Sequence, residues 1–286
     1  MEFSNAGEKW NTKLFRTLNS AMSFGIAYIL LTIGDFASKS VMARMYSIKG
    51  IWYFYGVHYN SEIKEWYQKN SVLVHSSGLV FIFFASIISW IIFKNTERID
   101  SPFRLVFLWT SVIGICIICS QFMTAAFGTS DYNSPYATDF AFAIAWLYIK
   151  PAIAFMLAGF MFLVMVASTF FLTTPFLKFA FSYRKVYKLK ARRKYFFEVA
   201  MIPAFIGVLF STILIFPEKY IFIHFMQVLY ILITMVVCWY MLFYTDVDYD
   251  SLSRHTKLEK INFPLFTIFI LLTVLTQTIL QKGIKF

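Results

Sequence analysis

The stretch AMSFGIAYILLTIGDFASKS (residues 21–40) is the first long apolar segment of this chain, and it ends with an acid and a base. Twenty residues of α-helix, at 1.5 Å per residue, cover about 30 Å, which is the hydrocarbon thickness of a bilayer. Asp35 and Lys39 stand four positions apart, where helical side chains are neighbours. The stretch therefore predicts a transmembrane helix with an ion pair near its end.

The composition of the whole chain extends this interpretation. Of 286 residues, 59% are hydrophobic, 21% are aromatic and 14% are charged, and the mean hydropathy is +0.65. Soluble domains have roughly 45–50% apolar and roughly 25% charged residues. The composition therefore predicts an all-α polytopic membrane protein with about six to seven transmembrane helices.

Seven segments are apolar over a length that can cross a bilayer. They are residues 20–40, 72–93, 103–127, 151–177, 195–217, 220–243 and 263–281. Before them, Trp10, Leu14 and Leu18 recur every fourth residue in an otherwise polar stretch, which predicts an interfacial segment over residues 1–19. We expect residues 20–286 to form a single transmembrane domain.

Two connections are too apolar for plain loops. Residues 41–71 contain GIWYFYGVHYN, which is rich in aromatic and β-branched residues and favours short interfacial strands. Residues 136–150 are apolar but short, and they run directly into Pro151. This pattern predicts a re-entrant or half-helix segment, because unwound backbone at membrane depth must be buried in protein or face a cavity.

The net charge of +11 is concentrated in the loop at residues 178–194, which contains no acid. A basic loop next to a membrane segment is typical of a cytoplasmic loop on anionic lipid, not of a nucleic-acid-binding surface. The expected lipid contacts are Arg184, Lys185, Lys188, Lys190, Arg192, Arg193 and Lys194. With the N-terminus inside, 17 of the 26 basic residues fall on the cytoplasmic side, which predicts a cytoplasmic N-terminus in a bacterial inner membrane.

Ionisable residues inside membrane segments are costly and are functional candidates by default. Asp35, Lys39, His75 and Asp139 form the candidate polar cluster. Glu198 follows the basic loop, and we expect it to pair with that loop. No complete zinc, nucleophile, phosphate-binding or dinucleotide motif is present, so the sequence predicts no catalytic residue, no metal ligand and no cofactor.

The segment DFASK (residues 35–39) resembles the H-E-x-x-H helix of site-two-type intramembrane zinc metalloproteases. Asp35 stands where the first His of that motif would be, Phe36 where the catalytic Glu would be, and Lys39 where the second His would be. The following ARMYSIK (residues 43–49) and the predicted strands are similar to the continuation of that helix in the family.

The third metal ligand of the resembled family is an Asp in a motif that contains Asn and Pro. Asn133, Pro135 and Asp139 follow this order, with shorter spacing and with Phe140 in place of Gly. The resemblance implies the fold of an intramembrane protease without its activity, because Phe36 has no titrating group and a lysine ammonium repels Zn²⁺.

Three functions remain open at this point. The first is a non-catalytic membrane subunit or scaffold, a pseudoprotease, that binds another membrane protein or forms an oligomer within the lipid. The second is a transporter or channel subunit with a polar path around Asp35, His75 and Asp139. The third is an enzyme that acts within the bilayer and uses Asp35, His75 or Asp139 as acid and base.

Overall fold

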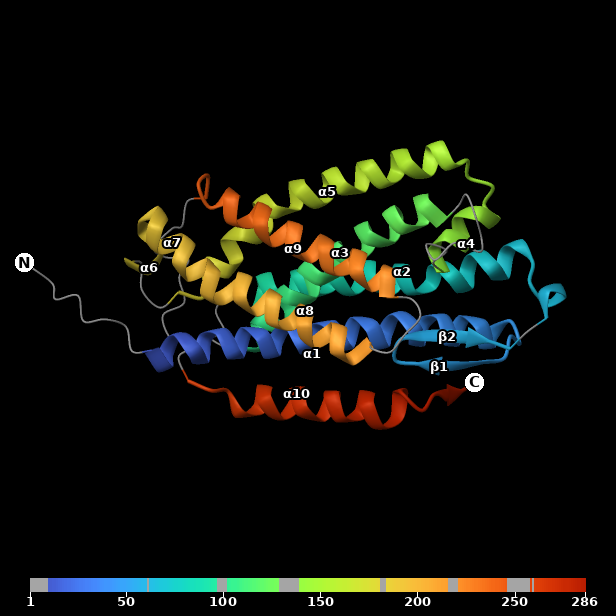
Figure 1. Cartoon of the computed structure of the whole chain (residues 1–286), viewed down its shortest axis with the longest axis horizontal. Coiled ribbons are helices and arrows are strands. Elements are labelled where there is room, and N and C mark those ends of the chain that lie inside the picture. The colour runs from blue at the N-terminus through green and yellow to red at the C-terminus, as the bar shows by residue number, and fades with distance from the viewer. Residues whose placement is uncertain are drawn as a thin grey trace, which may run out of the picture.

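The computed structural model describes residues 10–60, 62–96, 102–128, 139–180, 184–215, 221–245, 258 and 260–286. Long helices run side by side along the longest axis of the molecule, and a small sheet lies at one end (Figure 1). Within the described residues, seven helical spans are long and apolar enough to cross a membrane. The chain is therefore an all-α multi-pass integral membrane protein, as the composition predicts.

The bounds of the long helices follow the apolar segments closely. They are α1 (Trp10–Met45), α2 (Gln68–Asn95), α3 (Phe103–Gly128), α5 (Pro151–Leu177), α8 (Ile202–Ile215), α9 (Ile221–Met241) and α10 (Phe263–Leu275). A π-helical turn at Phe197–Met201 joins α7 (Leu189–Phe196) to α8, so that Leu189–Ile215 forms one span. A second π-helical turn at Thr276–Leu280 extends α10.

The centre of the bundle is formed by α1 and α3. The most apolar window of α3 is 78% buried and that of α1 is 72% buried, whereas the values for α5 and α10 are 22% and 17%. Trp109 of α3 packs edge-on against Phe24 of α1 and Phe176 of α5, with ring centroids 5.1 Å and 4.9 Å apart. The outer helices therefore keep wide apolar faces, which is the arrangement expected in lipid.

The N-terminal part of α1 corrects the expectation of an interfacial segment over residues 1–19. Residues 1–9 lie outside the described part, and residues 10–19 are the first turns of α1 itself. The side chains of Arg16, Thr17 and Asn19 are buried. Arg16 forms an ion pair with Glu198 (2.8 Å), and Thr17 donates to the Glu198 carbonyl (2.9 Å). These polar residues are internal because partners elsewhere in the bundle satisfy them.

The Arg16–Glu198 ion pair gives Glu198 a partner that the sequence did not suggest. Its carboxylate meets a guanidinium from the first helix, which lies 182 positions away. The pair connects α1 to the π-helical turn before α8. Local charge in the sequence could not indicate this long-range partner.

A three-stranded antiparallel sheet covers one end of the bundle. Its order is β2 (Gly56–Tyr59), β1 (Gly50–Tyr53), β3 (Ile284–Lys285), so that the C-terminal strand lies against β1 and leaves β2 at the edge. The first two strands fall inside the predicted stretch 41–71. The third was not predicted, because two residues are too few to give a strand pattern.

The short helix α4 (Asp139–Trp146) occupies the position of the predicted re-entrant segment. A turn follows at residues 147–150, and Lys150 caps α5, with Pro151 at its first position. Small residues such as Ala125 and Ala141 let α4 pack closely against α3. The packing places the N-terminus of α4, and hence Asp139, inside the bundle.

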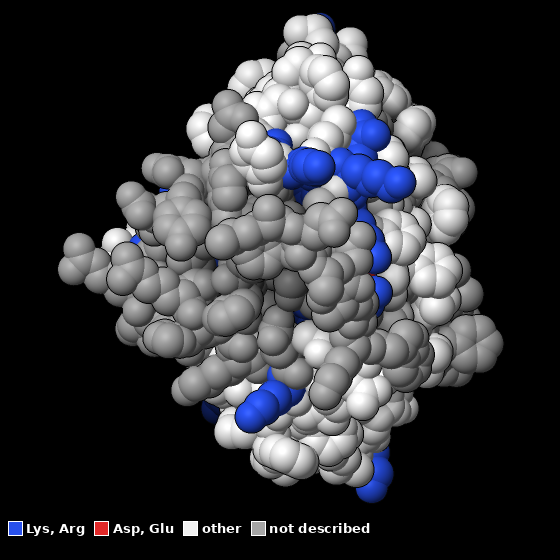
Figure 2. Space-filling view, turned by 90° about the vertical axis from the view of Figure 1, so that its left-hand side faces the viewer, with Lys and Arg blue, Asp and Glu red and all other residues white. Residues whose placement is uncertain are grey.

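The basic segment forms α6 (Arg184–Tyr187) and α7, at the end of the molecule opposite to the sheet (Figure 1). Lys and Arg side chains gather on the described surface of this end (Figure 2). Lys188, Lys190 and Lys194 are exposed, as a lipid-binding surface requires. The side chains of Arg184 and Lys185 lie outside the described residues.

Two arginines of this segment depart from the prediction of lipid contacts. Arg192 is only 9% exposed and donates to the backbone carbonyls of Val186 (2.9 Å), Leu242 (3.1 Å) and Thr245. Arg192 therefore bonds to backbone carbonyls of α6 and of the residues that follow α9, inside the protein. The guanidinium of Arg193 lies 4.6 Å from the centre of the Trp239 ring, which is cation–π contact, and its side chain is half-buried.

Candidate functional site

Asp35 and Lys39 lie on one face of α1 and point into the bundle. Their side chains are one helical turn apart, and Lys39 Nζ lies 3.0 Å from Asp35 Oδ1. Asp35 is 7% exposed and Lys39 is 3% exposed. A charged pair so deeply buried is costly to desolvate, and it is tolerated when each charge has close partners.

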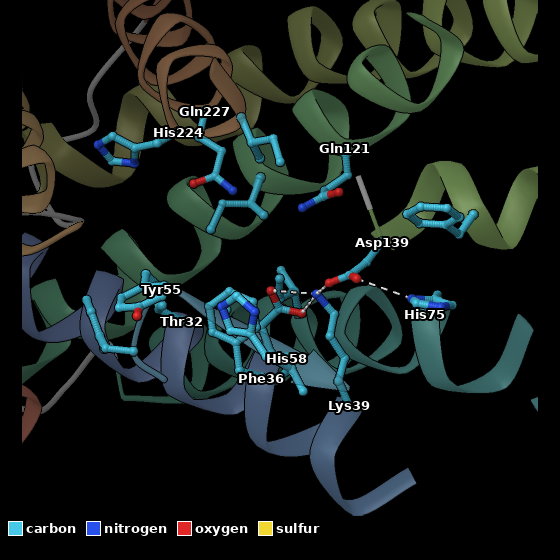
Figure 3. Close-up of a pocket in the computed structure, with 18 of the residues that line it drawn as sticks. Thr32, Phe36, Lys39, Tyr55, His58, His75, Gln121, Asp139, His224 and Gln227 are labelled. Carbon is cyan, nitrogen blue, oxygen red and sulfur yellow. Dashed lines mark hydrogen bonds and ion pairs between the residues drawn. The ribbon is translucent and has the colours of Figure 1, made fainter. Parts of the chain in front are cut away.

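Two further elements bring their side chains to this pair. Asp139, the first residue of α4, accepts from Lys39 Nζ at 2.8 Å, and its other carboxylate oxygen lies 3.2 Å from His75 Nδ1 on α2. Figure 3 shows the side chains of Lys39, His75 and Asp139 converging from three helices. We call Asp35, Lys39, His75 and Asp139 the Lys39 cluster. All four residues of the candidate polar cluster therefore meet, although Lys39 and Asp139 are 100 positions apart. Asn133 and Pro135 of the resembled motif lie outside the described residues.

The close contact of α1 and α2 at this cluster requires a glycine. A Cβ atom on Gly78 would lie 1.7 Å from Asp35 Oδ1 and 2.7 Å from Lys39 Cε. Neither distance is sterically possible, so the bare backbone of α2 is what admits the carboxylate. Gly78 was not singled out from the sequence, because a single glycine in an apolar helix has no distinctive pattern.

The Lys39 cluster lies in the wall of a cavity of about 480 Å³. Its lining comes from α1, α2, α3, α4, α9 and the β2 strand, and includes both charged and aromatic side chains. Trp66 stacks on the His75 ring with centroids 5.2 Å apart, and Tyr59 meets the same ring edge-on at 5.6 Å. Cavities of this size, apolar with a few convergent polar groups, are typical of ligand sites.

A second polar group lies elsewhere along the same cavity. His224 of α9 lies within hydrogen-bond distance of two hydroxyl groups: Nδ1 is 3.1 Å from the Tyr28 hydroxyl and Nε2 is 3.0 Å from Thr212 Oγ1. Gln227 lies one turn further along α9 and also lines the cavity (Figure 3). Tyr28, Gln121 and Gln227 could not be singled out from the sequence, since neutral polar residues barely change the hydropathy of a helix.

The described side chains of the site lack the glutamate and histidines of the resembled motif. Phe36 lines the cavity at the position of the catalytic Glu in the resembled motif, and Lys39 Nζ lies 4.8 Å from the centre of its ring. Among the described residues, the hydrogen-bond partner of His75 Nδ1 is the Asp139 carboxylate. The described residues also contain no group of three His, Cys, Asp or Glu placed to hold a metal ion.

Comparison with known proteins adds no relative to this description. No family model, no curated protein and no solved structure matches the chain. The class of the protein therefore follows from its own residues. It is a multi-pass α-helical membrane protein with a buried ion-pair cluster in the wall of an internal cavity.

Proposed function

We propose that this chain is a non-catalytic membrane protein, related to intramembrane metalloproteases but proteolytically inactive, that binds a segment of another membrane protein. One observation carries the proposal. Lys39 places its ammonium within 3.0 Å of two carboxylates, Asp35 and Asp139, which stand where the resembled family has metal ligands.

The electrostatics of the Lys39 cluster support an inactive centre. A zinc ion needs ligand atoms with lone pairs, and a protonated lysine has none. In this chain the ammonium supplies positive charge between the same two acids that would face a metal. Phe36, in the position of the general base, cannot accept a proton. In this proposal, Lys39 holds the two acids together, and the site has neither the metal ion nor the general base that hydrolysis requires.

The edge strand β2 supplies a place for the partner to bind. Asn60 N donates to Lys49 O, and the register pairs Ile51 with His58, so alternate residues of β2 face away from β1. Val57 and Tyr59 therefore direct their N–H and C=O groups toward the outer edge. Both residues also line the cavity. An extended segment could add to this edge through backbone hydrogen bonds and place its side chains beside the Lys39 cluster.

The charged surface of α7 supports the orientation that we propose. Exposed Lys188, Lys190 and Lys194 lie at the same end of the bundle as the first turns of α1 (Figure 1). With this end in the cytoplasm, the lysines would contact the anionic inner leaflet, each contributing about 1 kcal/mol. We propose a bacterial inner membrane with a cytoplasmic N-terminus, in which the sheet and the cavity lie toward the opposite side.

Site-specific photocrosslinking in cells tests the partner. A photoreactive benzoylphenylalanine replaces His58, the exposed side chain of β2, and in the control it replaces Phe160 on the outer face of α5. We expect one discrete product from position 58 and none from position 160. A mass increase of about 33.4 kDa would identify the partner as a second copy of this chain.

The same experiment includes a variant specific for strand addition. Val57→Pro removes a backbone N–H that points outward, and proline is tolerated on edge strands in this position. We expect Val57→Pro to abolish the product from position 58 while the protein still accumulates in the membrane. Equal products from positions 58 and 160, or a product indifferent to Val57→Pro, would contradict binding at β2.

A transporter or channel subunit is the second candidate, favoured by the length of the polar lining. The cavity joins the Lys39 cluster to the His224 and Gln227 group, so polar side chains occur at separate places along it. If this lining is a transport path, then Asp139→Asn should abolish solute flux in proteoliposomes. Flux that is absent from the wild-type protein would exclude this candidate for the solutes tested.

A further inference from the structure

Three oxygen atoms in the cavity wall lack hydrogen-bond partners among the described residues. They are Gln121 Oε1, Tyr59 Oη and Ser71 Oγ. Gln121 is 8% exposed and Ser71 is fully buried. An unmade hydrogen bond of a buried polar group is destabilising, so three such oxygens in one cavity indicate a missing hydrogen-bonding partner.

These oxygens surround the Lys39 cluster. Ser71 lies one helical turn before His75 on α2, and the Tyr59 ring meets His75 edge-on. Gln121 points from α3 toward the cluster from the other side (Figure 3). A small pocket of about 10 Å³ separates its side chain from Asp35 and Lys39. That volume admits about one water-sized group.

The charges of the cavity are also unbalanced. Among the described lining residues, Asp35 and Asp139 carry two negative charges, and Lys39 is the only Lys or Arg. Its ammonium is already shared between both carboxylates, so the cluster keeps one negative charge when the imidazole of His75 is neutral. An uncompensated charge in a low-dielectric site is strongly unfavourable. The site therefore favours a further positive charge.

We propose that the cavity binds a primary ammonium or guanidinium group on an apolar stem. Such a group has several N–H donors, which matches the three unpartnered oxygens, and a positive charge, which matches the excess of carboxylate. The stem would lie against Trp66, Phe142 and Tyr59, aromatic rings in the same wall. Aromatic faces also attract cations directly.

This chemistry excludes three related ligands. A quaternary ammonium has the charge but no N–H donor, an alcohol has a donor but no charge, and a carboxylate has the wrong sign. The proposal goes beyond partner binding at β2, because a free amine would satisfy it as well as a basic side chain. It is therefore tested on the purified chain, without any partner.

Isothermal titration calorimetry of the purified protein in detergent, with n-butylammonium chloride as the probe, tests the proposal. We expect saturable binding by the wild-type chain, and none with tetramethylammonium, n-butanol or butyrate. Gln121→Leu should weaken binding about tenfold or more, because hydrogen bonds to charged groups contribute about 1.5–3 kcal/mol. Asp35→Asn should weaken it further.

Gln227→Leu is the matched control, since Gln227 is the same residue type in the same cavity, beside His224. We expect it to leave the affinity within twofold. Equal elution profiles and unfolding temperatures of the two Gln→Leu variants would establish that both are folded. If Gln121→Leu does not fold, Tyr59→Phe replaces it, because it removes one unpartnered oxygen and keeps the ring.

The source of the ligand is distinguished by a second probe, N-acetyl-lysine methylamide, which carries the same ammonium on a capped backbone. Tighter binding than that of n-butylammonium would assign the site to a peptide side chain, and weaker binding to a free amine. Equal binding of n-butanol, unchanged affinity in Gln121→Leu, or no binding of either amine would overturn the proposal. None of these results depends on the crosslink at β2.

Discussion

Gly78→Ala perturbs the Lys39 cluster without removing any of its charged groups. The added Cβ would lie 1.7 Å from Asp35 Oδ1, whereas ordinary contact begins at 3.4 Å. The carboxylate, or the helix that carries it, must therefore move by about 1.7 Å (3.4 minus 1.7). A displacement of this size would break the 3.0 Å contact between Asp35 and Lys39.

The expected cost follows from these distances. Overpacking a well-packed site costs about 1–3 kcal/mol, and breaking a buried ion pair costs about 3–5 kcal/mol. The two overlap, because the same movement relieves the clash and breaks the pair. Alanine in place of glycine in a helix raises the free energy of unfolding by about 1 kcal/mol, because its helix propensity is higher. We expect Gly78→Ala to lower the free energy of unfolding by about 2–4 kcal/mol.

Equilibrium unfolding in mixed micelles with increasing SDS, followed by circular dichroism, measures this free energy. Gly159→Ala on α5 is the matched control, because a Cβ there would have no atom within 4 Å. We expect Gly159→Ala to change stability by no more than about 1 kcal/mol, in the stabilising direction. Equal stability of the two variants would refute the packing of α2 against Asp35.

Further predictions concern single charged residues. Lys39→Met leaves the buried Asp35 and the half-buried Asp139 without their ammonium and should lower the free energy of unfolding by about 3–5 kcal/mol, whereas exposed Lys282→Met should not. Equal SDS midpoints of the two variants would contradict the buried pair. Arg192→Met leaves carbonyls at the end of α9 unbonded and should cost about 2–4 kcal/mol in the same assay, against little change for exposed Lys194→Met. If Arg192 served only to contact lipid, Arg192→Met and Lys194→Met would both keep the wild-type free energy of unfolding, and both would weaken the contact with anionic lipid.

Most of the fold could be predicted from the sequence, because apolar length alone marks each membrane span. The predicted segment 151–177 coincides with α5, and the segment 103–127 ends one residue before α3 does. The beginning of α1 could not be predicted. Its first turns are polar, and they are internal only because Arg16 meets Glu198 and Asn19 donates to the carbonyls of Leu258 and Lys260. Such partners, about 180 and 240 positions away, leave no local pattern.

The candidate site was predictable in part for the same reason. Asp35 and Lys39 could be paired from helical spacing, and the resemblance placed Asp139 beside them. His75 could be singled out only because histidine is rare in membrane segments. Gln121 and Ser71 gave no signal, because what distinguishes them is a side-chain oxygen without a hydrogen-bond partner among the described residues.

Metal analysis of a variant with an H-E-x-x-H motif tests whether Lys39 takes the place of a zinc ion. The triple variant Asp35→His, Phe36→Glu, Lys39→His rebuilds H-E-x-x-H on α1, with Asp139 left as the third ligand. We predict that the purified wild-type chain carries no stoichiometric zinc, that the triple variant binds about one zinc per chain, and that adding Asp139→Asn removes it. Stoichiometric zinc in the wild-type protein, lost in Asp139→Asn, would contradict the replacement of a metal ion by Lys39, because the lysine ammonium and a zinc ion cannot both lie between Asp35 and Asp139.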